Sequence, residues 1–253
     1  MASATLQQAP ESPEPQEKIS AFSRVVGVIF SPKPTFQSIA RRPSWLLPTI
    51  LLCLASLAYI MAFGSRPGAW RQYMQSQFDR SSRVQQLSDQ QRQQALAMQL
   101  KITPIITPVI VVIATFASIM VAALVLWGLF SGGAGLKFGF KQALGIVAHG
   151  WMPYFFSGLL ATVVTLVKDP ADIDLEHPLA SNVGAFLPSD TSKFLLTFCQ
   201  SLDIFTIWAL CLVALGFAAI APKKLKFGGA LATIVITWLV YVLIRSGLTA
   251  AFS

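Results

Sequence analysis

Charged residues are scarce in this sequence. Only 12% of its 253 residues are Asp, Glu, Lys or Arg, whereas 54% are hydrophobic, and an ordinary soluble domain is about 25% charged. The mean hydropathy is +0.61. These values exclude a soluble enzyme with a conventional charged surface, and they exclude a disordered chain. Because the apolar residues fall into long runs, the sequence predicts an all-α, polytopic transmembrane helix bundle.

Cysteine and acidic residues are also few. Cys53, Cys199 and Cys211 show neither a paired spacing nor a Cys/His cluster, so no disulfide framework and no zinc site are expected. The 19 basic residues outnumber the 11 acidic ones and give a net charge of +8. No nucleic-acid-reading motif accompanies this charge. We therefore expect the lipid bilayer, and not nucleic acid, as the partner of the basic residues.

Signatures of common enzymes are missing as well. The sequence contains no HExxH, GxSxG, phosphate-loop or dinucleotide motif. The acidic run Asp172, Asp174 and Glu176 lacks the glycine and glutamate that a calcium loop needs at its sixth and twelfth positions. We therefore expect no enzyme, no cofactor and no metal. Residues 1–17 are rich in Pro, Glu and Gln and predict a disordered tail, not a signal peptide.

A membrane domain with five spans is expected over residues 18–253. Crossing a bilayer takes about 20 apolar residues, and the runs that meet this need lie at about 45–63, 102–130, 143–167, 200–221 and 228–250. Residues 64–101 are expected to form an extracytoplasmic helical loop. Within this loop Ser88 followed by Gln91 resembles a capping box at the start of a helix.

Two short segments before the first span are expected to lie on the membrane surface. Residues 19–31 are too few to span, yet they place large apolar side chains on one helical face. That face contains Phe22, Val25, Val26, Ile29 and Phe30. Basic side chains are expected to hold the two segments on anionic lipid. They are Arg24, Lys33, Arg41 and Arg42.

The distribution of basic residues predicts the orientation. Residues 18–42, 131–141 and 222–228 carry Lys and Arg without any acid, whereas 168–203 is mainly acidic. The positive-inside rule then places the N-terminus in the cytoplasm and the C-terminus outside. Residues 64–101 carry six basic and two acidic residues, but long loops count less in this rule. The expected location is a bacterial cytoplasmic membrane.

Two ionisable residues near the spans are candidates for function, because such groups are costly in a membrane. Asp203 and Arg245 both lie about 26 Å from the inner ends of the last two spans. This matched depth predicts a structural ion pair at the outer boundary. A transport or proton-relay role, or separate contacts with headgroups, are the alternatives.

His149 is the third candidate. It lies about 12 Å into the third span, and Pro153 removes the hydrogen bond to its carbonyl, so the pattern predicts a kink at this point. We expect a hydrogen bond from the imidazole to a neighbouring helix, with Thr233 and Thr237 as candidate partners. A pH-sensing or ligand-binding role is the alternative.

Small residues recur every four positions along the second span. Ala114, Ser118 and Ala122 form one ladder, and Gly128 and Gly132 form a GxxxG motif. Such ladders let helices approach closely. They predict packing within the bundle or self-association of two copies.

Three motifs follow one another along the chain at a characteristic spacing. They are SPKPTF to RPSWLLP at 31–48, GG to FKQA and HGWMP at 132–153, and LDIFTIW with LG at 202–216. In order and spacing they resemble prokaryotic members of the Yip family of Ypt/Rab-interacting membrane proteins. The resemblance implies five spans, a cytoplasmic N-terminus and a non-enzymatic membrane role. Eukaryotic relatives act in vesicle trafficking and contact small GTPases.

The leading hypothesis is therefore a non-catalytic integral membrane protein that organises the membrane or partner proteins. The alternative is a small permease or channel. In that case His149 and the face with Thr233 and Thr237 would line the path of the solute.

Overall fold

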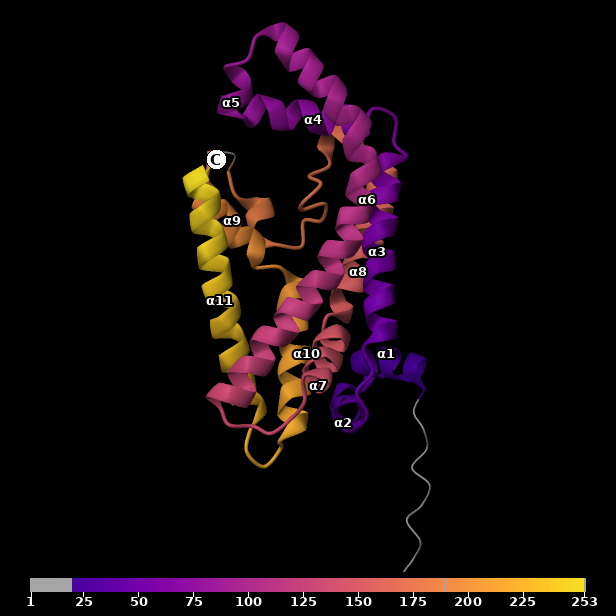
Figure 1. The fold of residues 1–253 in the computed structure, drawn as a ribbon, viewed down its shortest axis with the longest axis vertical. Coiled ribbons are helices and arrows are strands. Elements are labelled where there is room, and N and C mark those ends of the chain that lie inside the picture. The colour runs from indigo at the N-terminus through magenta and orange to yellow at the C-terminus, as the bar shows by residue number, and fades with distance from the viewer. Residues whose placement is uncertain (1–19, 189, 253) are drawn as a thin grey trace, which may run out of the picture.

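The computed structural model describes residues 20–188 and 190–252, which form a bundle of long helices (Figure 1). The predicted disordered tail, 1–17, lies outside the described residues. The long elements are α3 (Leu46–Gly64), α6 (Asp89–Gly128), α7 (Phe140–Gly150) with α8 (Met152–Val167), α10 (Ile204–Ile220) and α11 (Phe227–Phe252). The predicted all-α membrane bundle is confirmed.

Within residues 20–188 and 190–252, four helical segments are long and apolar enough to cross a membrane. They are Leu46–Gly64, Asp89–Gly133, Phe140–Val167 and Phe227–Phe252. α10 is apolar too, but it has only 17 residues. The fourth predicted span, at about 200–221, corresponds to α10. Its helix starts a few residues later than predicted, because α9 (Lys193–Ser201) ends before Leu202 and Asp203 caps a new helix.

α6 begins well before the predicted second span. Ser88 accepts a hydrogen bond from the backbone N–H of Gln91, and the Gln91 side chain accepts one from the N–H of Ser88. This capping box starts a helix of 40 residues, about 60 Å long. The helix therefore continues without a break across the expected boundary between loop and span at 101/102. Pro104 and Pro108 lie inside the helix, not in its first turn.

A helical hairpin covers one end of the bundle, which we call the hairpin end (Figure 1). It consists of α4 (Ala69–Arg80), α5 (Ser82–Gln85) and the first turns of α6. Met74 and Phe78 of α4 are buried. The ring of Phe63, near the end of α3, packs edge-on against Trp70 at 5.1 Å and Tyr73 at 6.2 Å. These apolar contacts hold the hairpin against the bundle.

α1 (Ala21–Phe30) and α2 (Pro32–Arg41) lie at the opposite end, which we call the basic end (Figure 1). Phe36 and Ile39 of α2 are fully buried, and α2 packs on α7 and α10. The apolar face of α2 therefore rests on protein and not on lipid, while contact of its exposed basic side chains with lipid stays a prediction. In α1 the predicted apolar face is divided, because Val25 faces the protein while Phe22 and Phe30 are 68% and 80% exposed.

The hydrophobic core is concentrated toward the basic end. Buried side chains of α2, α6, α7, α10 and α11 form one cluster there. The rings of Phe130 and Phe217 stack with centroids 4.6 Å apart. Phe130 belongs to the π-helical turn Leu129–Gly133 that ends α6. Large exposed apolar side chains on the outside of α6 and α11 suit these helices to a lipid environment.

The glycines at which the helices approach most closely are not those of the predicted GxxxG motif. A Cβ atom at Gly128 or Gly132 would meet nothing within 4 Å. At Gly150, in contrast, a Cβ would lie 3.1 Å from the backbone nitrogen of Val213 in α10, and at Gly158 it would lie 3.1 Å from Ala55 in α3. The packing prediction for Gly128 and Gly132 is thus wrong within a single copy of the chain.

Candidate functional site

The connection between α8 and α9 folds back against the bundle. It contains two 3₁₀ turns, Pro170–Asp172 and Val183–Phe186. Backbone hydrogen bonds tie it to the start of α10, from Val183 to Leu202 at 3.2 Å and from Ile204 to Ser181 at 3.1 Å. The loop is therefore a fixed part of the structure, and its side chains can contribute to a site.

Asp203 caps α10. Its Oδ1 atom accepts hydrogen bonds from the N–H groups of Phe205 at 2.8 Å and Thr206 at 3.2 Å. Its Oδ2 atom accepts one from the hydroxyl of Ser181. An N-cap carboxylate satisfies backbone donors that the helix itself leaves open and interacts favourably with the helix dipole. The acidic residue at position 203 thus has a structural role, because it caps α10 where the chain breaks between α9 and α10.

Arg245 forms an ion pair with Glu176 of the connecting loop, with 3.9 Å between Nη2 and Oε2. The predicted Asp203–Arg245 ion pair is therefore wrong in its partner. The two residues nevertheless line the same cavity, as their matched depth suggested. The side chains of Arg245 and Glu176 are 37% and 67% exposed, so we expect this pair to contribute no more than about 1 kcal/mol to stability.

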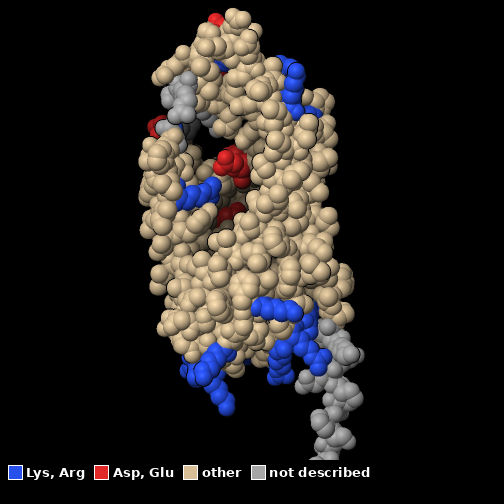
Figure 2. Space-filling view, viewed as in Figure 1, with Lys and Arg blue, Asp and Glu red and all other residues tan. Residues whose placement is uncertain are grey.

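A cavity of about 900 Å³ lies between α6 and α11 and opens on the side of the bundle. Its other walls are formed by α8, α9, α10 and the connecting loop. We call it the lateral hollow. Figure 2 shows it as a dark opening in the upper half of the molecule, with acidic atoms inside it and a basic side chain at its edge. The small-residue ladder Ala114, Ser118 and Ala122 lines this hollow, and Ala122 also packs against the hydrophobic core.

The lateral hollow is apolar at one end and polar at the other. α6 contributes Val121 and Val125, and α11 contributes Ile234 and Trp238. The polar groups come from the connecting loop, from the junction of α9 and α10, and from the C-terminal half of α11. They include Glu176, His177, Ser181, Asn182, Gln200, Asp203 and Arg245.

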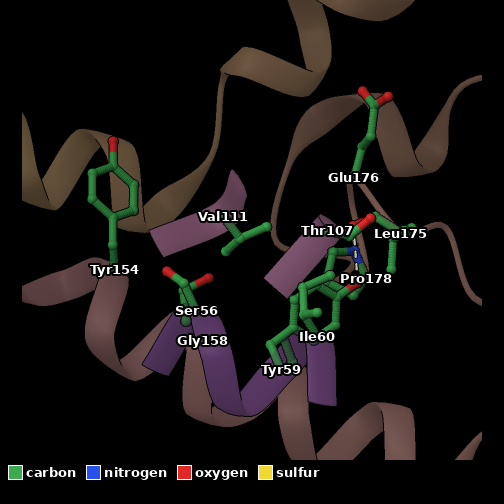
Figure 3. A pocket seen from close by; sticks show the side chains of 12 residues that line it. Ser56, Tyr59, Ile60, Thr107, Val111, Tyr154, Gly158, Leu175, Glu176 and Pro178 are labelled. Carbon is green, nitrogen blue, oxygen red and sulfur yellow. Dashed lines mark hydrogen bonds between the residues drawn. The ribbon is translucent and has the colours of Figure 1, made fainter. Parts of the chain in front are cut away.

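A smaller cavity of about 430 Å³ adjoins the lateral hollow and shares Tyr154, Ser157, Glu176 and Pro178 with it. Figure 3 shows its lining side chains, with Tyr59 bonded to the connecting loop. The Tyr59 hydroxyl donates to the carbonyl of Leu175 at 2.9 Å. The Tyr154 hydroxyl donates to Thr206 at 3.2 Å. These tyrosines anchor the loop and α10 from the side of α3 and α8.

His177 lines the lateral hollow. Its Nε2 atom is buried and has no hydrogen-bond partner among the described residues. Burial lowers the pKa of His177 below its ordinary value, with a smaller contribution from Arg245 in the same direction and opposing ones from Asp174, Glu176 and Asp203. The imidazole is therefore neutral at pH 7.

His149 lies away from the lateral hollow. It is fully buried, and its Nδ1 atom is 2.8 Å from the carbonyl oxygen of Gly145 one turn back in α7. The expected bond to a neighbouring helix is not found, since Nε2 has no partner in the described part of the chain. α7 ends at Gly150 and α8 begins at Met152, so the helix is interrupted where Pro153 predicted a kink.

The two threonines proposed as partners of His149 bond to their own helix instead. Thr233 donates to the carbonyl of Gly229 at 3.1 Å, and Thr237 donates to the carbonyl of Thr233 at 2.8 Å. Thr237 lines the lateral hollow. A threonine hydroxyl that bonds four residues back is an ordinary way to satisfy it inside an apolar helix.

Arg24 does not serve as a lipid contact. It is only 7% exposed, and its Nη1 atom donates to the carbonyl of Arg42 at 2.6 Å and to the hydroxyl of Ser44 at 3.0 Å. Burial and the nearby Arg42 lower its pKa from the ordinary value. Arg24 therefore ties α1 to the connection between α2 and α3, and its predicted role at the membrane surface is wrong.

The other predicted surface residues are exposed at the basic end. Lys33, Arg41 and Arg42 project from α2 and its C-terminus. Five lysines of the neighbouring turns are also exposed: Lys137, Lys141, Lys223, Lys224 and Lys226. Figure 2 shows basic side chains gathered at this end. These basic residues could be predicted from the sequence, because lysines between apolar runs mark the ends of membrane spans.

Sequence reasoning missed Glu176, His177 and Ser181 as site residues. They lie in a segment without helical periodicity, so no pattern predicted which residues of the bundle they would face. Asp203 was the available signal, because an acid at the start of an apolar run is a typical N-cap. Among the described residues no group of three or more His, Cys, Asp or Glu is placed to hold a metal ion.

The fold and its apolar helices define an integral membrane protein of the helical-bundle class. The chain belongs to the Yip1 domain family, whose family model matches residues 26–246. The resemblance deduced from the sequence motifs is thereby confirmed. A search of curated proteins and a search of solved structures each find no match.

Proposed function

We propose that this protein is a non-catalytic membrane organiser whose basic end recruits partner proteins at the cytoplasmic surface of a bacterial inner membrane. The observation that carries this proposal is the composition of the basic end. Phe22, Val26 and Phe30 form an exposed apolar row on α1. Exposed basic side chains of α2 and the adjacent turns surround the same end of the bundle.

This combination suits a surface that touches anionic headgroups and holds a protein partner. Basic side chains near a membrane surface are each attracted to anionic lipid by about 1 kcal/mol. An exposed row of large apolar side chains among them adds a hydrophobic contact. The proposed orientation, with the N-terminus in the cytoplasm and the C-terminus outside, follows from the same basic residues through the positive-inside rule.

A permease is the alternative that the sequence left open, with a path past His149 and the Thr233/Thr237 face. The lateral hollow offers less support for it. Its lining, as far as the described residues show, includes Thr237 but neither His149 nor Thr233. His149 is enclosed in the core. The organiser hypothesis therefore fits the geometry better.

Site-specific photo-crosslinking in native membranes tests the proposal. A photoreactive residue in place of Arg41, at the basic end, should yield a recurrent protein adduct. The same residue in place of Met98, exposed near the hairpin end, serves as the matched control and should not yield that adduct. Replacing Phe22 and Phe30 with Ser should remove it. Adducts with lipid alone at position 41 would contradict the proposal.

A further inference from the structure

The lateral hollow has the dimensions of a binding site for a small amphipathic molecule. Its volume of about 900 Å³ lies within the usual range of ligand pockets, about 300–1,000 Å³. Along α11 it reaches from Arg245 to Ile234, a rise of about 16 Å. Figure 2 shows that it opens on the side of the bundle, not at an end. A molecule already in the bilayer could therefore enter it from the side.

The position of the polar end fits the headgroup region. Arg245 lies 18 residues after Phe227, the first residue of α11, and so about 27 Å along the helix. The hydrocarbon core of a bilayer is about 30 Å thick. The polar end of the hollow is thus near one boundary of the core, while the apolar part extends toward the middle of the membrane.

The apolar part is built like a slot for an acyl chain. Val121 and Val125 of α6 line it with exposures of 59% and 44%. Ile234 and Trp238 of α11 line it too. The small side chain of Ser118 keeps the slot open on the side of α6. Large apolar side chains exposed to an open space inside a membrane protein gain by contact with hydrocarbon.

The polar end offers one cation and one available carboxylate. Arg245 meets Glu176 at 3.9 Å, which is longer than a hydrogen bond, so the guanidinium N–H groups can still bind an anion. Glu176 remains 67% exposed. The carboxylate of Asp203 is already occupied by backbone N–H groups and by Ser181. The buried Nε2 atom of His177, unpartnered among the described residues, is one more polar atom at this end.

We propose that the lateral hollow binds one phospholipid whose headgroup carries both a phosphate and a primary ammonium, as in phosphatidylethanolamine. Arg245 and His177 hold the phosphate, and Glu176 holds the ammonium. One acyl chain lies along the apolar slot between α6 and α11. The pairing of one cation with one carboxylate selects this zwitterionic headgroup over a purely anionic one.

Native mass spectrometry of the full chain in detergent, with added lipid, tests this assignment. Phosphatidylethanolamine should bind as a single molecule about tenfold more tightly than phosphatidylglycerol or phosphatidylcholine, as expected for one additional hydrogen bond to a charged group. Arg245→Gln should weaken the binding of phosphatidylethanolamine by tenfold or more. Glu176→Gln should abolish the preference over phosphatidylglycerol. Lys224→Gln, at the basic end, should change neither.

A second pair of variants separates binding from folding. Ser118→Trp fills the slot and should abolish lipid binding while the thermal unfolding midpoint is kept. Ile113→Trp on the same helix, 61% exposed and outside the lining of the hollow, is the matched control and should bind lipid normally. Equal binding of the three lipids would overturn the proposal. It would also be overturned by undiminished binding in Ser118→Trp, or by a dimer that excludes lipid.

Discussion

At the scale of single residues, the closest helix contacts depend on glycines. Gly150 lets α7 approach α10, and Gly158 lets α8 approach α3. The sequence predicted close packing at Gly128 and Gly132 because their spacing matches a known motif. Spacing alone cannot tell which glycine faces another helix, since that depends on how each helix is rotated in the bundle.

Replacing Gly150 with Ala should lower stability. The new Cβ would lie 3.1 Å from the backbone nitrogen of Val213 and 3.2 Å from its Cα, and backbone atoms cannot move aside as a side chain can. We expect a loss of about 1–3 kcal/mol, measured as a lower thermal unfolding midpoint in detergent.

Gly128→Ala is the control for this variant. A Cβ there meets nothing within 4 Å, and alanine is favoured over glycine inside a helix by about 1 kcal/mol. The unfolding midpoint should therefore stay the same or rise. If Gly128→Ala destabilised the protein as much as Gly150→Ala, the proposed difference in packing would be refuted.

His177 should make the protein sensitive to acid. Its folded-state pKa lies below the ordinary value, which is about 6.5. The unfolded chain therefore takes up the proton more readily, and stability falls as the pH drops below about 6.5. Arg245 adds to this effect, whereas Asp174, Glu176 and Asp203 oppose it. His177→Gln should reduce the decrease in unfolding midpoint between pH 7.5 and 5.5. If the unfolding midpoint of His177→Gln fell by as much as that of the unmodified protein, other groups would be responsible for the acid sensitivity.

The polar residues of the site were only partly predictable. Counting residues along α10 and α11 brought Asp203 and Arg245 to one depth, and both do line the lateral hollow. The count could not supply Glu176, because this residue reaches Arg245 from an irregular loop. Helical periodicity carries no information about the path of such a loop.

At the scale of elements, α6 shows which helix signals are dependable. The capping box at Ser88 and Gln91 was predicted from two residues, and both of its hydrogen bonds are present. The boundary at 101/102 was inferred from a change in hydropathy. Hydropathy changes there, but the backbone continues as one helix through Pro104 and Pro108. A change of environment is therefore not the same as the end of an element.

Ser88→Ala should fray the start of α6. Loss of an N-cap side chain typically costs about 1 kcal/mol, and the effect should be confined to the first turn because the rest of the helix keeps its bonds. Hydrogen–deuterium exchange should become faster at residues 89–92. Ser81→Ala is the matched control, because Ser81 precedes α5 without a side-chain capping bond. Equal protection in both variants would contradict the prediction.

At the scale of the whole molecule, the long apolar elements were predictable to within a few residues. α3, the α7–α8 pair and α11 lie close to the runs at 45–63, 143–167 and 228–250. Such runs are reliable because the bilayer core demands them. The burial of α2 was not predictable, since an amphipathic helix packs equally well on lipid or on protein.

Cysteine labelling tests the proposed orientation. In a variant without the three native cysteines, Lys224→Cys at the basic end should react with a membrane-impermeant maleimide only from the cytoplasmic side. Gln86→Cys, exposed in the hairpin, should react only from the outside. If both cysteines reacted from the same side, the chain would cross the membrane an even number of times between them. That result would refute the proposed orientation.

The shortness of α10 has a consequence for the surrounding bilayer. With 17 residues it spans about 25 Å, while its neighbour α11, with 26 residues, spans about 39 Å. The hydrocarbon core is about 30 Å thick, so α10 is too short to cross it at full thickness. The stretch of α11 from Phe227 to Arg245 nearly matches that thickness. We therefore expect the bilayer to be thinner beside α10 than beside α11 and the protein to favour thinner regions of membrane.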